Sequence, residues 1–209
     1  MYFDKHNCDL FDQVRPIKWV DPKQGDTYDI LVVGAGAGGL VTAAQAKGRG
    51  AHVALIERGF MGGDCLNTGC VPSKAFLKCC NVAHNARTAD KFGVIVKGVE
   101  IDFKAIMDRM KKIRAEISEN DSAERFSTNM GVDLFLGHAK FVSKNEVEIN
   151  GKRLKFLKAC IATGGRPLIP EIEGLSSVKF HTSDSIFNLD SLPSSMLVLG
   201  CGPIGCELG

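Results

Sequence analysis

The chain has 209 residues, of which 44% are hydrophobic and 24% are charged, with a formal net charge of +2. This is ordinary globular composition, and the near-neutral charge excludes the strongly basic surface of a nucleic-acid-binding or membrane-surface protein. No apolar run reaches the roughly 18 residues of a membrane span, and the N-terminus lacks the apolar core of a secretory signal. We therefore expect a cytoplasmic protein with no nucleic-acid or membrane partner.

The N-terminal stretch, residues 1–27, carries scattered acidic side chains. Neither a secretory signal nor a transit peptide has this composition. We expect an irregular arm that Phe11, Val14 and Trp19 dock onto the rest of the chain.

A compact strand–helix–strand unit follows the arm. The apolar run Tyr28–Val33 predicts a buried strand, and the Ala-rich stretch Gly36–Lys47 predicts a helix that ends at the next glycines. His52–Ile56 predicts a second strand. The unit predicts an α/β fold with a parallel sheet.

The turn between this first strand and helix has the glycine pattern of a dinucleotide site. Gly34 allows a tight turn, Gly36 lets the backbone approach a pyrophosphate, and Gly39 lets helix and strand pack closely. Glu57 ends the second strand, where a carboxylate can accept a ribose hydroxyl. The context favours dinucleotide binding over a glycine-rich turn in an unrelated α/β protein.

Two cysteines stand close together in the stretch "MGGDCLNTGCVPSKAF". An extended chain would hold Cys65 and Cys70 too far apart for a disulfide, so a bend is needed, which Gly69 can supply. A helix is predicted over Pro72–Arg87, with proline at its first position. The helix N-terminus and Lys74 would favour a thiolate at Cys70, so the pattern indicates a redox-active dithiol.

Two other interpretations of the cysteines are open. A zinc site could use Cys65, Cys70, Cys79 or Cys80, and His84, although adjacent cysteines suit tetrahedral coordination poorly. Cys65 and Cys70 could also be inert core residues, which their polar neighbours disfavour. Buried, inert thiols are expected at the six remaining positions, which are Cys8, Cys79, Cys80, Cys160, Cys201 and Cys206.

The second half of the chain predicts one helix and several strands. Phe103–Ile117 has helical periodicity, and its basic stretch "RMKKIR" is interpreted as a solvated face. Asn150–Gly151 predicts a hairpin turn. Strand-like runs occur at Leu134–Leu136, Ala139–Val142, Glu146–Ile149, Leu154–Phe156, Ala159–Ala162 and Met196–Leu199.

A second glycine pattern, made by Gly200, Gly202 and Gly205, follows the last of these runs and predicts a second dinucleotide site. The sequence stops inside the helix that should come next. We therefore expect it to be part of a longer protein.

The motifs "VVGAGAGG", "GGDCLNTGCVPSK", "GHA", "ATGGRP" and "GCGPIGCE" resemble, in order, those of the class I flavin-dependent pyridine nucleotide-disulfide oxidoreductases. Mercuric reductase-like and dihydrolipoamide dehydrogenase-like members are most similar. The resemblance covers residues 28–209. It implies a Rossmann-like FAD-binding domain with an inserted β-meander at 28–190, after the arm at 1–27. Residues 191–209 would be a linker and the start of a truncated NAD(P)-binding domain.

The resemblance also assigns cofactor contacts. NAD(P)H would bind at Gly200, Gly202 and Gly205. Asp64 stands where most relatives have Thr, and its carboxylate would repel phosphate unless it faces hydrogen-bond donors; Pro203 replaces a larger residue that covers the nicotinamide in some relatives. FAD would contact Gly34, Gly36, Gly39, Glu57, Arg58, Gly63, Asp64, Lys74, Ala139, Ala162, Thr163 and Gly164.

The same resemblance implies a catalytic set. Electrons would pass from NAD(P)H through FAD to a Cys65–Cys70 disulfide and then to a thiol, disulfide or metal-ion substrate. Cys65 would meet the substrate, Cys70 would face the flavin, and Lys74 would lie near flavin N5, paired with Glu207. A homodimer is implied for the full-length protein. Mercuric reductase-like activity is favoured; the alternatives are a dihydrolipoamide dehydrogenase, a non-catalytic FAD-binding module and a zinc-binding structural protein.

Overall fold

The computed structural model describes residues 4–209, so residues 1–3 of the expected arm lie outside the described part. Its centre is a six-stranded sheet in the order β3-β2-β1-β6-β5-β4. Strands β3, β2, β1 and β6 are parallel, and β6, β5 and β4 are antiparallel. The strands are β1 (Thr27–Val33), β2 (Val53–Glu57), β3 (Asp133–Leu136), β4 (Lys140–Ser143), β5 (Glu146–Ile149) and β6 (Lys152–Ile161). This arrangement confirms the predicted α/β, Rossmann-like class with an added β-meander.

Strand β6 joins the parallel and antiparallel parts of the sheet. Its second half runs parallel to β1, with Ile161 beside Val33, while its first half is antiparallel to β5, with Leu154 beside Val147. The two runs predicted here are therefore one strand, because Leu157 and Lys158, which lie between them, are part of the same strand. The Asn150–Gly151 turn is confirmed, with φ values of 48° and 76°.

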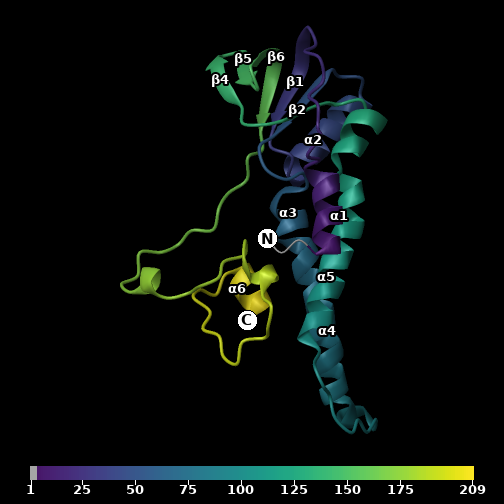
Figure 1. Ribbon diagram of the computed structural model, residues 1–209, viewed down its shortest axis with the longest axis vertical. Helices are drawn as coiled ribbons and strands as arrows, with labels where there is room; N and C mark the ends of the chain where they lie inside the picture. Colours follow the sequence, from purple (N-terminus) through teal and green to yellow (C-terminus); the bar gives the residue numbers. More distant parts are fainter. Residues whose placement is uncertain (1–3) are drawn as a thin grey trace.

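Helices pack on one face of the sheet and extend well beyond it. In Figure 1, α4 and α5 run side by side away from the sheet, and α1 lies along α5. The α-helices are α1 (Lys5–Val14), α2 (Ala37–Gly48), α3 (Gly63–Asn67), α4 (Cys70–Arg87), α5 (Phe103–Ser118) and α6 (Pro203–Leu208). Shorter helical turns occupy Ala89–Phe92, Glu119–Asp121, Arg125–Asn129, Leu175–Ser177 and Ile186–Asn188.

The N-terminal arm is only partly irregular, because Lys5–Val14 forms helix α1 while residues 15–26 form no helix or strand. Asp4 caps this helix by accepting a hydrogen bond from the Asn7 backbone N–H at 2.8 Å. Leu10 and Val14, four residues apart, are buried on one face. The docking role of Trp19 is confirmed, since its Nε1 donates to the Leu134 carbonyl at 3.3 Å and its ring packs on the core.

The core lies on both faces of the sheet. Val32 belongs to a cluster with α1, α2 and α3, while its neighbour Leu31 belongs to a second cluster with β3, β5 and β6. Both side chains are fully buried, as expected for adjacent residues of a central strand. Tyr28 is buried in the second cluster and donates its hydroxyl proton to Asp133 at 2.8 Å.

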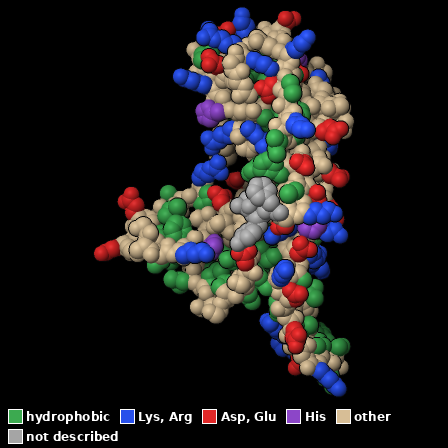
Figure 2. All heavy atoms as spheres, in the orientation of Figure 1, with side chains coloured by type: hydrophobic (Ala, Val, Ile, Leu, Met, Phe, Trp, Pro, Cys, Tyr) green, Lys and Arg blue, Asp and Glu red, His purple; other side chains and the backbone are tan. Residues whose placement is uncertain are grey.

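The strand predicted at Met196–Leu199 is absent. These residues are irregular and exposed, since no strand among residues 4–209 pairs with them. Figure 2 shows hydrophobic side chains gathered over the C-terminal part of the chain, where Leu192 and Leu197 are also exposed. Within residues 4–209, none of the helices combines the length and apolar character that a membrane crossing requires.

Candidate active site

The first glycine turn is shaped by close backbone contacts. Gly34 has φ of +102°, and a Cβ there would lie 2.2 Å from the Ala162 carbonyl oxygen. A Cβ on Gly39 would lie 1.8 Å from the Gly34 carbonyl oxygen. Both positions therefore exclude any other residue, in agreement with the tight turn and the close helix–strand packing inferred from the sequence.

Gly36 differs from these two glycines. A Cβ there would meet only the Cα of Gly63, at an ordinary 3.7 Å, so the protein's own packing does not require glycine. Helix α2 begins at the next residue with no side-chain cap and no acidic residue in its first turn. An uncapped, acid-free helix N-terminus beside an open backbone suits a phosphate, so the residues of this turn fit the pyrophosphate of FAD.

Glu57 is buried at the end of β2, next to the glycine turn. Its Oε2 accepts from the Ala35 backbone N–H at 2.6 Å, and its Oε1 accepts from Gly59 N–H at 2.5 Å. Each carboxylate oxygen keeps a lone pair for a further donor such as a ribose hydroxyl. Arg58 follows it and is exposed.

Arg15 lies at the same place and was missed by the sequence analysis. Its Nη1 donates to the backbone carbonyls of Glu57 at 3.1 Å and Gly59 at 3.2 Å. No sequence pattern marked it, because it comes from the arm and reaches this site only through the docking of α1.

The remaining expected FAD residues lie where parallel strands end. The backbone N–H of Gly137 donates to the Glu57 carbonyl at 2.9 Å, and that of Ala162 donates to Val33 at 2.8 Å. Ala139 packs against the second core cluster. Thr163 and Gly164 are exposed beyond β6. The structure thus brings four strand ends together at one edge, which is where ligands bind in such sheets.

The cysteine pair spans a sharp bend between two helices. Cys65 lies in α3, and Cys70 is the first residue of α4, so α4 begins before the expected Pro72. Proline is tolerated in this first turn because its N–H would have no partner within the helix. Gly69 supplies the expected bend, and a Cβ there would lie only 2.7 Å from the Asp64 carbonyl oxygen.

The two thiols lie within electrostatic reach of each other. Cys65 is half-buried and Cys70 is exposed. Burial raises the pKa of Cys65, and the hydrogen bond and charge of the Cys70 side chain raise it further, while the Cys70 backbone N–H opposes the shift. Cys65 therefore stays a protonated thiol at neutral pH when the pair is reduced.

The expected ion pair between Lys74 and Glu207 is present. The Lys74 ammonium and the Ser73 hydroxyl both donate to Oε1 of Glu207, the latter at 3.2 Å. The hydrogen bond raises the pKa of Lys74 and lowers that of Glu207. Charge on Cys70 and Cys65 also raises the pKa of Lys74, so the ammonium lies within electrostatic reach of both sulfurs.

The second glycine turn repeats the geometry of the first. Gly200 has φ of +106°, and a Cβ on Gly205 would lie 2.5 Å from the Gly200 carbonyl oxygen. Gly202, in the middle position, has open space around it. Asp64, which stands where most relatives have Thr, is an exposed residue at the N-terminal end of helix α3.

The expectation that the other six cysteines are buried is wrong. Cys79 and Cys160 are half-buried, while exposed thiols occur at Cys8, Cys80, Cys201 and Cys206. They lie on outward helix faces or in the open C-terminal turn, where nothing covers them. Within residues 4–209, no three His, Cys, Asp or Glu residues are placed to hold a metal ion, so the zinc alternative has no support.

The basic stretch of α5 is not simply a solvated face. Arg114 is buried, and its Nη1 donates to the Asn67 carbonyl oxygen at 2.8 Å, between the two cysteines in sequence. Helical periodicity could have placed Arg114 near the buried face, but its charge led to the opposite interpretation.

These elements define an α/β protein that has two glycine-rich turns and a pair of cysteines at the start of a helix. Comparison with known proteins identifies the same class. Residues 28–209 match the family model described as pyridine nucleotide-disulphide oxidoreductase. The chain therefore belongs to this family, whose cofactors are FAD and NAD(P)H.

Two relatives illustrate the similarity. A mercuric reductase of Lysinibacillus sphaericus is 36% identical over 184 residues, which are 88% of this chain and 34% of the relative. A dihydrolipoyl dehydrogenase of Acholeplasma laidlawii is 37% identical over 185 residues, which are 86% of this chain and 54% of the relative. The chain thus spans between a third and about half of the length of these relatives.

Proposed function

We propose that this chain carries the FAD-binding and redox-active part of an enzyme that moves electrons from NAD(P)H to a Cys65–Cys70 disulfide. The enzyme would then reduce a small thiol-reactive substrate, either a disulfide or a metal ion. We also propose the division into an arm at 1–27, an FAD-binding domain at 28–190 and the start of an NAD(P)-binding domain at 191–209. The observation that carries the proposal is the α3–α4 bend at Gly69, which places Cys65 in one helix and Cys70 at the start of the next, within electrostatic reach of each other.

The cofactor would be held by the first glycine turn and Glu57. Gly36 leaves room for a pyrophosphate at the start of α2, and Glu57 has lone pairs for the ribose. Bound FAD would supply two-electron chemistry between NAD(P)H and the disulfide. Cys70 is exposed, which leaves room for a cofactor ring against its sulfur.

The chain's own residues would handle charge and protons during disulfide reduction. Opening the S–S bond takes two electrons and, once both thiols are formed, two protons. The raised pKa of Cys65 favours the protonated form of its sulfur. The Lys74 ammonium favours the negative charge that remains on Cys70, and Glu207 holds that ammonium in place.

Mercuric ion is the substrate we favour, and lipoamide is the second candidate. The similarity to the mercuric reductase described above supports the first, and that to the dihydrolipoyl dehydrogenase supports the second. Soft thiolates bind soft metal ions well, so the same dithiol chemistry suits both substrates.

The test measures oxidation of NADH and NADPH by the intact flavoprotein with Hg(II) or with oxidised lipoamide. We expect turnover with one of them, and loss of turnover in both Cys65→Ser and Cys70→Ser. An intact protein that binds FAD but turns over neither substrate, and whose disulfide NAD(P)H does not open, would be the non-catalytic alternative.

A further inference from the structure

We propose that Arg114 is a positioning residue that, together with helix α1, clamps the segment carrying Cys65 and thereby stabilises the Cys65–Cys70 disulfide. The inference rests on the proposed function of this pair. It assigns a redox role to an arm and a buried arginine that touch neither sulfur.

Helix α1 is tied to both ends of the segment 61–67. Near its C-terminal end, the Val14 carbonyl accepts from the Met61 backbone N–H at 3.1 Å. At the other end, Arg114 bridges the two elements, with Nη1 donating to the Asn67 carbonyl at 2.8 Å and Nη2 donating to Asn7 Oδ1 at 2.7 Å. Cys65 lies between these two attachment points.

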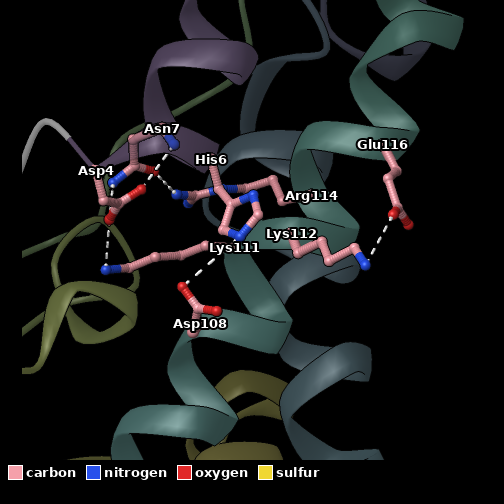
Figure 3. A network of polar contacts seen from close by, with 8 residues as sticks. All are labelled: Asp4, His6, Asn7, Asp108, Lys111, Lys112, Arg114 and Glu116. Carbon is pink, nitrogen blue, oxygen red and sulfur yellow. Dashed lines mark hydrogen bonds and ion pairs between the residues drawn. The ribbon is translucent and has the colours of Figure 1, made fainter.

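The bridge is itself held in place by charged and polar groups (Figure 3). Asn7 donates from its amide nitrogen to Asp4 Oδ2 at 3.1 Å, which turns its amide oxygen toward Arg114. Lys111, one turn before Arg114 on α5, donates to the same Asp4 oxygen at 2.8 Å. The figure shows Asp4, Asn7, Lys111 and Arg114 converging between α1 and α5, so the guanidinium has little freedom to move.

The far side of the bridge is equally stiff. The Asn67 side chain donates to the carbonyls of Met61 at 3.0 Å and Gly63 at 2.8 Å, which closes the segment on itself. A pull on the Asn67 carbonyl is therefore transmitted to the whole of α3, including Cys65.

A gain in folding stability does not explain the burial of the Arg114 guanidinium, because the desolvation of a charge is unfavourable. Only 4% of its surface is exposed, burial lowers its pKa against the opposing charge of Asp4, and its Nε has no partner among residues 4–209. Buried charges often return little net stability for their desolvation, whereas a planar two-pronged group fixes geometry well. A fixed geometry matters here because a disulfide forms only within a narrow range of distance and dihedral angle.

The clamp should therefore act on the equilibrium between dithiol and disulfide. When Cys65 and Cys70 are held near bonding geometry, less conformational freedom is lost as the S–S bond forms. In a glutathione buffer the pair gives two electrons and two protons to oxidised glutathione, which becomes two molecules of glutathione. A looser segment lowers the equilibrium constant of this exchange.

The experiment equilibrates the intact flavoprotein with glutathione buffers and counts free Cys65 and Cys70 by alkylation and mass spectrometry. In Arg114→Lys, which keeps the charge but loses the two-pronged bridge, we expect the constant for disulfide formation to fall about three- to tenfold. A tenfold fall corresponds to about 30 mV for a two-electron couple. Asp4→Ala removes the acceptor that orients the Asn7 amide, at a more exposed position. It should lower the constant for disulfide formation by a smaller factor than Arg114→Lys does.

Lys112→Ala is the matched control. Lys112 is on the same helix, is mostly exposed and, among the residues that the structure describes, pairs with Glu116 alone, at 3.8 Å. In Lys112→Ala the constant for disulfide formation should stay within about twofold of the wild-type value, as expected for the loss of an exposed ion pair. If Arg114→Lys is too unstable to purify, Asp4→Ala decides the test.

Two outcomes separate this inference from the proposed function. A wild-type couple that responds normally, together with variants that lose thermal stability but keep the wild-type constant, would leave Arg114 a purely structural residue and overturn the inference alone. A wild-type protein in which Cys65 and Cys70 never form a disulfide would overturn the proposed function and the inference with it.

Discussion

Lys74 and Glu207, 133 residues apart in the chain, form an ion pair that joins helix α4 to helix α6. The pair thus connects the helix that begins with Cys70 to the second glycine turn. Because charge on both cysteines also raises the pKa of this lysine, the proposed redox pair and the second glycine turn meet at Lys74.

Replacing Lys74 should slow the chemistry more than it weakens cofactor binding. In Lys74→Met, we expect the rate at which NAD(P)H opens the disulfide to fall by at least about tenfold, because a positive charge beside developing thiolate is lost. Stopped-flow measurement of thiol appearance, with FAD content determined in parallel, tests this. Lys78→Met, an exposed lysine one turn later on α4, is the control. An unchanged rate in Lys74→Met would remove Lys74 from the proposed mechanism.

The first glycine turn predicts different effects for two similar substitutions. Gly36→Ala should keep the thermal stability of the FAD-free protein, because the new Cβ meets only an ordinary contact, yet lower FAD affinity roughly tenfold or more by obstructing the pyrophosphate. Gly39→Ala should destabilise the protein itself, since its Cβ would lie 1.8 Å from a carbonyl oxygen. Thermal unfolding and FAD titration distinguish the two. Normal FAD affinity in Gly36→Ala would contradict the assignment of this turn.

The reactivity of Cys65 should depend on pH in a defined direction. Burial and Cys70 raise its pKa, so the thiolate fraction is small at neutral pH and increases as the pH rises through that raised value. We expect the alkylation rate of Cys65 in the reduced protein to be still rising at about pH 9.5, where an ordinary cysteine is levelling off. In Cys70→Ser the midpoint should move to lower pH, because the charge of the Cys70 side chain is removed. A midpoint below the ordinary cysteine value in the wild type would show that the shift has the wrong sign.

Tyr28 provides a test of the fold that does not involve the redox site. Its buried hydroxyl accepts from the Gly25 N–H at 3.2 Å and donates to Asp133. Tyr28→Phe removes the acceptor of the Gly25 N–H and leaves His52 as a side-chain partner of Asp133, at 3.4 Å. It should cost about 1–3 kcal/mol of unfolding free energy, or a melting temperature lower by roughly 3–10 °C. Phe92→Leu, at a ring that is 84% exposed, should leave the melting temperature nearly unchanged. Equal melting temperatures for Tyr28→Phe and the wild type would contradict the role of this hydroxyl.

The sequence was sufficient wherever local pattern and tertiary structure agree. The strand at Tyr28–Val33 and the turn at Asn150–Gly151 were predicted because an apolar run and an Asn-Gly pair each have one strongly favoured conformation. The bend at Gly69 was predicted because two thiols must meet within a short segment.

The remaining features depend on packing partners that no local window contains. Helix α1 is stabilised by docking on α5, so its own composition did not indicate a helix. Arg114 is buried because Asn7 and Asn67, both distant in sequence, supply acceptors for it. Met196–Leu199 has the composition of a strand, but a strand also needs a neighbour, and residues 4–209 offer none.

Strand β6 also determines the order in which the protein can assemble. It pairs Thr27 with Lys155, roughly 130 residues apart, whereas its pairing with β5 closes a hairpin of adjacent residues. Closing the long loop between β1 and β6 costs more chain entropy than closing the hairpins. The β4–β5–β6 hairpins can therefore form early, and the pairing of β1 with β6 forms later. On the ribosome, β1 and its glycine turn emerge long before the strand that completes their edge has been synthesised. We therefore expect the nucleotide-binding edge to be among the last parts of the sheet to form, and FAD to bind only late in folding.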